Sequence, residues 1–209
     1  MSRNNTGAII LAAGQGSRFK AKKQFLEFHG KPLYKHVYDT ISSVISSSHI
    51  VVVGVDIEGG DTRCASVKCG LDYLASVGQF ERVVICEAAR CLVTKEQIEQ
   101  IVAANEPSIC YVNPVVDTVI LKDKTYINRE DCLHLVSPQA FDFNLLYQAY
   151  QQADLGELRT DETRLMYEAY GIEPDFLIGA DNLYKVTYPK DIAVLESIYQ
   201  DINSDCTHR

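Results

Sequence analysis

The sequence predicts an α/β protein in which a mostly parallel central sheet is flanked by helices. Mainly apolar runs of strand length (Ala8–Leu11, His49–Gly54 and Arg82–Cys86) alternate with segments of helical periodicity. Continuous apolar runs are typical of parallel strands that are covered on both faces. Ligands of such sheets bind beyond the carboxyl ends of the strands, so we expect the segments 12–23 and 87–90 to border one cleft.

Helical periodicity and capping signals place the expected helices. They are 33–44, which follows Pro32, Thr62–Ala75, the stretch from Thr94 to Ala104, Phe143–Ala153, Asp161–Tyr170 with Thr160 as its N-cap, and a last helix that begins at Pro189. Short strands are expected at Phe176–Ile178 and Tyr184–Thr187. The residues from Asp201 onward are expected to fray.

The composition suits a globular chain with one domain that spans residues 1–209. The net charge of −8 argues against nucleic acid as a partner. No apolar run is long enough to span a membrane, and MSRNNTG does not resemble a signal peptide, so we expect a cytoplasmic protein without a membrane partner. The seven cysteines are odd in number and lack CxxC spacing, which favours reduced thiols.

One short stretch is basic, although the chain as a whole is acidic. The run that ends at Leu11 is followed by small residues that leave backbone N–H groups accessible, namely Ala12, Ala13, Gly14 and Gly16. Basic residues come next, namely Arg18, Lys20, Lys22 and Lys23. Amides and cations together suit a triphosphate, although the stretch is neither a Walker loop nor a GxGxxG motif. The alternative is an ordinary strand-to-loop connection beside a solvated basic face.

The motif LAAGxGxR followed by KQF resembles the signature of nucleotidyltransferases with a Rossmann-like fold. Within them the chain is most similar to the 2-C-methyl-D-erythritol 4-phosphate cytidylyltransferases and their ribitol-phosphate relatives. Further matching blocks extend the resemblance over nearly the whole chain: GGDTRCASVKCGL (59–71), VVICEAARCLV (83–93), VDTV (116–119), NREDCLHLVSPQAFDF (128–143), RTDE (159–162) and KVTYPKDIAVLE (185–196).

The resemblance implies a Mg²⁺-dependent enzyme that joins CTP and a small polyol phosphate into a CDP-polyol and releases pyrophosphate. The leading acceptor is 2-C-methyl-D-erythritol 4-phosphate, because NREDCLHLVSPQAF and RTDE are closest to that branch. Ribitol 5-phosphate, or another polyol or sugar phosphate for surface polymers, is the alternative acceptor. An alternative from a different functional class is a protein that binds nucleotide but no longer catalyses a reaction. A phosphate nucleophile arrives mostly ionised, so none of the five histidines needs a catalytic role.

The resemblance also implies roles for individual residues around the nucleotide. Arg18, Lys23 and Lys185 match cations that act on the phosphates, together with the loop residues Ala12, Ala13, Gly14 and Gly16. Lys22 stands where the family usually has proline, so Lys22 and Lys23 could exchange roles. The cytosine and its ribose are expected to be surrounded by Gly59, Gly60, Arg63 and Ser66. For the two glycines, a plain turn and helix cap is the alternative.

A second set of residues matches positions around the acceptor and the metal. Arg90, Thr118, Arg129 and Ser137 are expected to grip the acceptor phosphate and hydroxyls. Glu87 stands where the family carries aspartate, and it is a candidate for Mg²⁺ or a substrate hydroxyl. Asp181 is a second candidate for the metal, and for both acids a surface or salt-bridged role is the alternative. Asp161 matches a family motif, but helix capping would also explain it.

The segment from about 111 to 136 carries short β-like runs and no helical pattern. Members of the family extend an arm here that reaches across a homodimer, and Arg129 and Ser137 would then act on the partner subunit. This arm looks shorter than usual. The alternative is a local hairpin within the same subunit.

Overall fold

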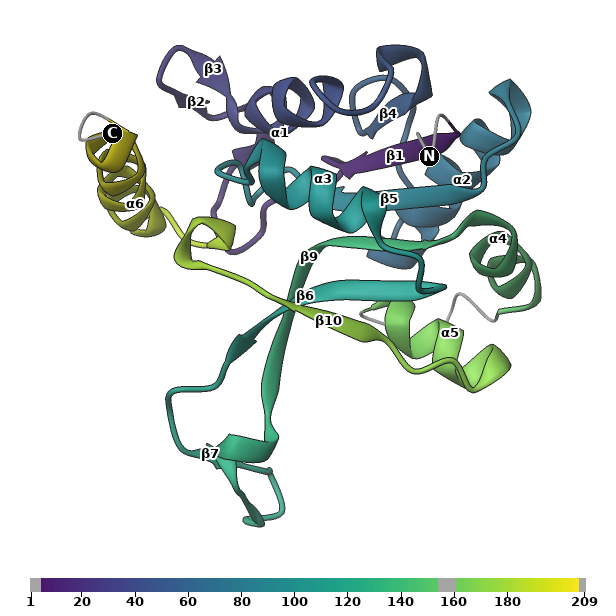
Figure 1. Ribbon diagram of the computed structural model, residues 1–209. Coiled ribbons are helices and arrows are strands. Elements are labelled where there is room, and N and C mark those ends of the chain that lie inside the picture. The colour runs from purple at the N-terminus through teal and green to yellow at the C-terminus, as the bar shows by residue number, and fades with distance from the viewer. Residues whose placement is uncertain (1–4, 154–160, 207–209) are drawn as a thin grey trace.

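A six-stranded sheet forms the centre of the fold in the computed structural model, which describes residues 5–153 and 161–206 (Figure 1). The strands follow the order β10-β6-β9-β5-β1-β4 across the sheet. Their bounds are Thr6–Leu11 (β1), Ile50–Val53 (β4), Arg82–Glu87 (β5), Ser108–Pro114 (β6), Leu133–Asp142 (β9) and Asp175–Ile178 (β10). Neighbouring strands are parallel except where β9 pairs with β5 and β6, so the prediction of a mostly parallel sheet is confirmed.

The antiparallel strand β9 was only partly predicted. The short β-like runs were expected to end near residue 136, whereas β9 continues to Asp142 and enters the middle of the sheet. It pairs with β5 through Val84↔Ala140 and with β6 through Ile109↔Ala140. Ala140 is fully buried between these two neighbours. The chain thus leaves the sheet along β6 and returns along β9, which a strand-by-strand pattern does not reveal.

Two layers of helices cover the sheet, one on each face (Figure 1). Because side chains alternate along a strand, Ile10 points into one apolar core and Ile9 into the other. The first core is completed by α1 (Leu33–Ser42), α3 (Lys95–Ala103) and α6 (Asp191–Cys206). The second is completed by α2 (Arg63–Val77), α4 (Phe143–Gln152) and α5 (Glu162–Tyr170). All six expected helices are therefore present.

Several helix boundaries differ from the prediction. The expected cap Thr160 lies outside the described residues, and the side chain of Asp161 caps α5 by accepting a hydrogen bond from Thr163 N. The segment from Asp201, expected to fray, continues α6 to Cys206 because Ile202 packs against the first core. The expected cap Thr94 is confirmed and forms a capping box with Gln97.

The segment Tyr184–Thr187 is not a strand, contrary to the prediction. It is an extended connection between a short 3₁₀ helix, η4 (Asp181–Leu183), and α6. Val186 N donates a hydrogen bond to the Ala89 carbonyl oxygen, which holds the segment beside the end of β5 without extending the sheet ladder. Other short elements near the N-terminal half of the sheet are η1 (Lys23–Phe25), η2 (Ser47–His49) and the small hairpin of β2 (Glu27–Phe28) and β3 (Lys31–Pro32).

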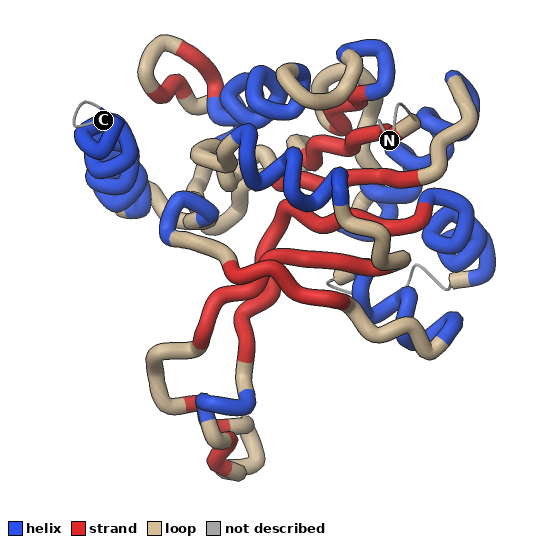
Figure 2. The backbone as a smooth tube through the Cα atoms, viewed as in Figure 1, coloured by secondary structure: helices blue, strands red, loops and turns tan. Residues whose placement is uncertain are grey.

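A hairpin arm, residues 115–132, projects away from the sheet (Figure 1). It contains β7 (Val119–Ile120), β8 (Tyr126–Ile127) and η3 (Arg129–Asp131), and Figure 2 shows that β6 and β9 form its stem. Large apolar side chains on the arm are exposed, including Val116 at 76% and Tyr126 at 74%. A projecting hairpin is therefore present, while its predicted role in a dimer stays a prediction.

Thiols in the core follow the prediction for reduced cysteines. Cys86, Cys91 and Cys110 are buried and form no disulfide. Burial raises the pKa of Cys91 and of Cys110 to about 12, so both thiols stay protonated at neutral pH. Among the helices that the structure describes, none has the length and apolar character that crossing a bilayer requires.

Candidate active site

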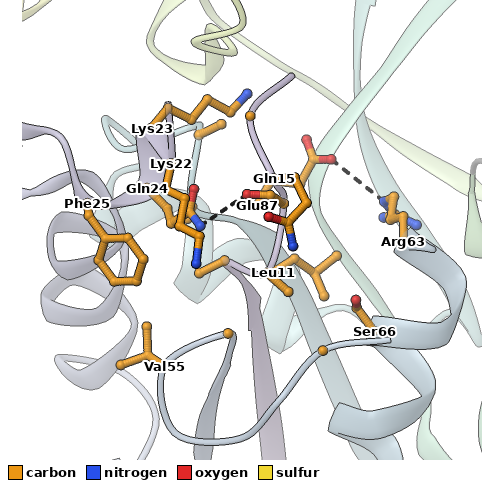
Figure 3. A pocket seen from close by; sticks show the side chains of 18 of the residues that line it. Leu11, Gln15, Lys22, Lys23, Gln24, Phe25, Val55, Arg63, Ser66 and Glu87 are labelled. Carbon is orange, nitrogen blue, oxygen red and sulfur yellow. Dashed lines mark hydrogen bonds and ion pairs between the residues drawn. The ribbon is translucent and has the colours of Figure 1, made fainter. Parts of the chain in front are cut away.

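A cleft of about 900 Å³ opens at the carboxyl ends of β1, β4 and β5 (Figure 3). Its walls come from the loop after β1, the segment after β4 and the first turn after β5, joined by Lys185 and Thr187. The sequence predicted that the segments 12–23 and 87–90 would border one cleft. Residues from both segments line it, so that prediction is confirmed.

The loop after β1 needs glycine where its backbone turns sharply. Gly16 has φ +66°, and a Cβ there would lie 1.8 Å from the Ala21 carbonyl oxygen. Gly14 differs, because a Cβ there would meet no heavy atom within 4 Å. The Gly14 carbonyl oxygen accepts a hydrogen bond of 3.1 Å from Nε2 of the buried Gln24. The backbone at Gly14 is thus held in place, while the space next to its Cα stays open.

The segment after β4 packs directly on this loop. Gly54 has φ +100°, and a Cβ there would lie 2.6 Å from Ala13 Cα. At Gly59 a Cβ would lie 2.3 Å from Ala13 Cβ, and at Gly60 it would lie 2.4 Å from Ala65 Cβ. Close packing, on the backbone of Ala13 at Gly54 and on alanine side chains at Gly59 and Gly60, therefore explains these three glycines. Gly54 and Gln24 are contributors that the sequence analysis did not single out.

Cations from both ends of the chain meet at this cleft. Arg18 and Lys22 are exposed and line it, as does the half-buried Lys185. Lys23 also lines it, and its Nζ donates a hydrogen bond to the Val186 carbonyl oxygen. Burial and then the charge of Lys185 lower the pKa of Lys23 from 10.5, although Glu87 acts in the opposite direction. Lys22 and Lys23 both reach the cleft, but Lys23 is the one anchored beside Lys185.

Glu87, at the end of β5, stands among three cations. Its Oε1 lies 2.8 Å from Lys185 Nζ and 3.6 Å from Arg63 Nε, and its Oε2 lies 3.4 Å from Arg90 Nε. Burial alone would raise the pKa of Glu87, but Lys185, Arg90 and Arg63 lower it below its ordinary value. The carboxylate is therefore ionised, and it holds the surrounding basic side chains in place.

Arg63 connects this carboxylate to a second one that sequence reasoning did not single out. Its Nη1 and Nη2 donate to Glu162 Oε1 and Oε2 at 2.6 and 2.9 Å. The Glu162 side chain is completely buried, and Tyr150 Oη donates to its Oε1 at 2.8 Å. Figure 3 shows Arg63 on the cleft wall, directed at Glu87. The only available sequence signal was the position of Glu162 within RTDE.

Five predicted substrate or metal residues do not line the cleft: Arg90, Thr118, Arg129, Ser137 and Asp181. Arg90 lies just behind it, where its guanidinium contacts Glu87 and the Leu183 carbonyl oxygen. Ser137 is buried in β9, and its Oγ accepts a hydrogen bond from Glu87 N at 3.3 Å. The expectation that Ser137 acts on a partner subunit was therefore wrong, because Ser137 contacts the end of β5 in its own chain.

Thr118 and Arg129 lie on the hairpin arm. Arg129 is exposed, and its guanidinium donates to the Val116 carbonyl oxygen at 2.7 Å. Asp161, for which helix capping was the alternative, does cap α5 and also accepts a hydrogen bond from Gln139.

The predicted second metal ligand, Asp181, is not in the cleft. It is exposed at the start of η4, because the neighbouring Asn182 turns inward to bond Leu92 and Gln97. No group of three or more His, Cys, Asp or Glu side chains suited to a metal occurs in the described part of the chain. The carboxylates on the cleft wall are Asp56, Glu58, Asp61 and Glu87. Because Mg²⁺ commonly binds one or two carboxylates together with substrate phosphates, this donor set fits an ion that enters with a triphosphate.

A basic, glycine-shaped loop at the carboxyl edge of a parallel sheet is the arrangement of proteins that bind phosphorylated nucleotides. The family model described as "IspD: 2-C-methyl-D-erythritol 4-phosphate cytidylyltransferase" matches residues 55–201. The chain belongs to this family, which confirms the resemblance drawn from its motifs.

Individual relatives agree over most of the chain. A 2-C-methyl-D-erythritol 4-phosphate cytidylyltransferase from Desulforamulus reducens is 31% identical over 97% of this chain and 99% of its own length. The enzyme of the same name from Chromobacterium violaceum is also 31% identical, over 91% of this chain and 96% of its own. Among solved structures, the bifunctional IspDF from Campylobacter jejuni has a TM-score of 0.76 and 29% identity. The match covers 90% of this chain and 53% of the bifunctional protein, about half its length.

Replacing Gly16 by Ala tests the loop geometry. We expect Gly16→Ala to lower the free energy of unfolding by about 1–3 kcal/mol, because alanine must adopt a positive φ and approach the Ala21 carbonyl. The matched control is Gly14→Ala, where space is open, with an expected change within about 0.5 kcal/mol. Urea unfolding of both variants measures the difference, and equal effects would contradict the geometry.

The lowered pKa of Lys23 predicts an alkaline limit on turnover. As pH rises through that lowered pKa, below 10.5, Lys23 loses its charge earlier than an exposed lysine does, so kcat/KM should fall. In Lys23→Arg the fall should move to higher pH, because a guanidinium stays protonated. A pH profile that is identical in the two proteins would argue against a cationic role for Lys23.

The lowered pKa of Lys23 also predicts how folding stability depends on pH. The free energy of unfolding should rise with pH in the range where kcat/KM falls. Because the folded-state pKa of Lys23 lies below the unfolded value, burial of the charged amine destabilises the fold at lower pH. This cost is relieved as pH rises through the folded-state pKa toward 10.5. Comparing the pH dependence of urea unfolding in the wild-type protein and in Lys23→Arg measures it.

Proposed function

We propose that the protein transfers a cytidylyl group from CTP to 2-C-methyl-D-erythritol 4-phosphate and releases pyrophosphate. The observation behind this proposal is the meeting of Arg18, Lys23 and Lys185 at one cleft beside a glycine-shaped loop. Family membership supplies the reaction class, and the names of the relatives favour this acceptor over ribitol 5-phosphate. Three retained phosphate-directed cations argue against a protein that only binds nucleotide.

The proposed reaction is a displacement at the α-phosphorus of CTP. An oxygen of the acceptor phosphate forms the new P–O bond, while the bond to the β-phosphate breaks and pyrophosphate leaves with the electron pair. The acceptor phosphate has its second pKa near 6, so it is mostly ionised at neutral pH and needs no general base. The difficulty is electrostatic, since two anions must meet and charge must be stabilised as the bonds change.

The residues around the cleft suit this electrostatic task. We assign Lys185 and Lys23 to the phosphates near the reacting centre, because Glu87 and the Val186 carbonyl hold their amines in place. Arg18 and the backbone of Ala12, Ala13, Gly14 and Gly16 are assigned to the rest of the triphosphate. Gly59, Gly60 and Ser66 line the opposite wall, where we place the cytidine, while the nitrogens of the neighbouring Arg63 are directed at carboxylates.

Mg²⁺ fits this site as a companion of the triphosphate. Glu87 is the carboxylate that we assign to it, and Asp61 on the same wall is a second one that the sequence analysis did not consider. When bound, the ion would neutralise phosphate charge. The exposed Asp181 is not assigned to it.

We assign the acceptor to the side of the cleft at Arg90 and Ser137, which both contact Glu87. Arg129 and Thr118 lie on the hairpin arm and do not line the cleft of their own chain. We therefore propose a homodimer in which the arm brings Arg129 to the acceptor bound in the partner subunit. A guanidinium suits this task because it can bind phosphate through two hydrogen bonds.

Replacing Lys185 by Ala tests the reaction. We expect kcat for pyrophosphate release from CTP and 2-C-methyl-D-erythritol 4-phosphate to fall by about 10²–10³, because a preorganised charge is lost. Lys95→Ala, which removes an exposed lysine of α3, is the control and should keep the wild-type rate. Wild-type turnover in Lys185→Ala would remove Lys185 from the site. If the wild-type protein releases no pyrophosphate with any polyol phosphate, the proposed function fails.

Replacing Arg129 by Ala tests the acceptor assignment. We expect the KM for the acceptor to rise about tenfold or more at saturating CTP, since a charged hydrogen bond is lost. Lys122→Ala on the same arm is the control and should leave KM unchanged. An unchanged KM in Arg129→Ala would remove the arm from the mechanism.

Mixing two defective variants tests whether Arg129 acts across subunits. In a hybrid of Arg129→Ala and Lys185→Ala chains, one site has Lys185 from its own chain and Arg129 from the other. Random exchange should then restore about a quarter of the wild-type rate at low acceptor concentration. No recovery after proven subunit exchange would show that Arg129 does not serve the partner.

A further inference from the structure

The buried carboxylate of Glu162 joins three helices at one point. It lies in the first turn of α5, and its two oxygens accept the paired Nη donors of Arg63 from the start of α2. Tyr150 of α4 donates to the same carboxylate. Both oxygens of Glu162 are therefore satisfied within the protein, and its side chain has no exposed surface.

The contacts of Arg63 do not stop at this pair. Its Nε lies 3.6 Å from Glu87 Oε1, the oxygen that lies 2.8 Å from Lys185 Nζ. A guanidinium is a planar fork, so fixing its two Nη atoms also fixes the direction of its Nε–H. The side chains thus form a row of alternating charge that runs from buried Glu162 through Arg63 and Glu87 to Lys185 in the cleft.

We infer that Glu162 is a positioning residue, which orients Arg63 so that Arg63 holds Glu87, and through it Lys185, in place for the transfer reaction. This inference rests on the proposed function, because it assigns Glu162 a part in that reaction. A buried ion pair is by itself weak evidence for a stabilising role. Here Arg63 of the pair also contacts Glu87, a carboxylate on the cleft wall. A purely structural link between α2 and α5 would not require that contact.

The substitution Glu162→Gln isolates this role with little change in shape. The amide offers Arg63 one acceptor oxygen and an NH₂ group, which cannot accept from the second Nη. The guanidinium of Arg63 is then no longer held in one orientation. It therefore no longer fixes the positions of Glu87 and Lys185. All the nitrogens of Arg63 are directed at carboxylates, so we expect the rate of the chemical step to change more than the affinity for CTP.

The experiment combines a crystal structure, steady-state kinetics and calorimetric titration of CTP. In folded Glu162→Gln, we expect Arg63 Nε to leave Glu87 and kcat to fall at least about tenfold, because reacting groups are misplaced. The Kd for CTP should change less than about threefold. Glu168→Gln, the same change further along α5 at an exposed ion pair with Arg164, is the matched control and should change neither quantity.

A double-variant cycle tests whether Glu162 acts through Arg63. In an Arg63→Met background, Glu162→Gln should reduce kcat by less than about twofold further. The inference is overturned if Arg63 keeps its contact with Glu87 in Glu162→Gln, if kcat stays at the wild-type value, or if the two losses add in full. A merely structural role would lower the unfolding temperature and leave kcat of the folded enzyme unchanged.

Two further outcomes remain decisive. Should Glu162→Gln not fold, Arg63→Lys replaces it, since lysine keeps the charge and loses the fork. The same loss of kcat with nearly unchanged CTP affinity supports the inference, and wild-type kcat overturns it. Should the wild-type protein show no cytidylyl transfer, the proposed function fails, while the position of Arg63 in the variant crystal still decides whether Glu162 orients it.

Discussion

The ion pairs of Glu87 with Lys185, Arg63 and Arg90 are the interactions on which the site depends. A carboxylate this deeply placed is costly to ionise unless cations surround it. The three partners come from different parts of the chain: Arg63 from α2, Arg90 from the turn after β5, and Lys185 from the connection before α6. One acidic residue at a strand end therefore brings together three elements that share no local sequence signal.

The connection before α6 is held rigidly enough to present Lys185. Asn182 bonds to Leu92 and Gln97, and Arg90 donates to the Leu183 carbonyl. Beyond them, Val186 is tied to Ala89 through its N–H and to Lys23 through its carbonyl oxygen. Both lysines assigned to the phosphates are thus fixed through the same short segment, although they lie far apart in the sequence. This is the preorganisation that electrostatic catalysis needs.

Sequence patterns were informative where the physics is local. Periodicity located all six helices, and strand order along the chain placed the two loops on one cleft, because parallel strands present their carboxyl ends at one edge. Motifs also identified the family. Contacts between distant segments could not be predicted in this way. The entry of β9 into the middle of the sheet and the burial of Glu162 against Arg63 depend on tertiary pairing, which no periodicity encodes.

The same distinction explains the errors at the site. The family resemblance assigned Ser137, together with Arg129, to the partner subunit as a residue of the arm, whereas Ser137 lies in the central strand β9, which begins at Leu133. Asp181 was a candidate metal ligand, but the inward turn of Asn182 leaves Asp181 in solvent. Gly54 was overlooked because its requirement for glycine comes from packing on the backbone of Ala13, a contact with another strand's loop.

We infer that the cations and the accessible backbone amides at this cleft bind a nucleotide triphosphate. A crystal structure of the protein with CTP and Mg²⁺ tests it most directly. We expect the triphosphate to lie between the loop after β1 and Lys185, with phosphate oxygens in contact with Lys23 and Lys185. A triphosphate bound elsewhere, or one in this cleft that touches neither lysine, would contradict it.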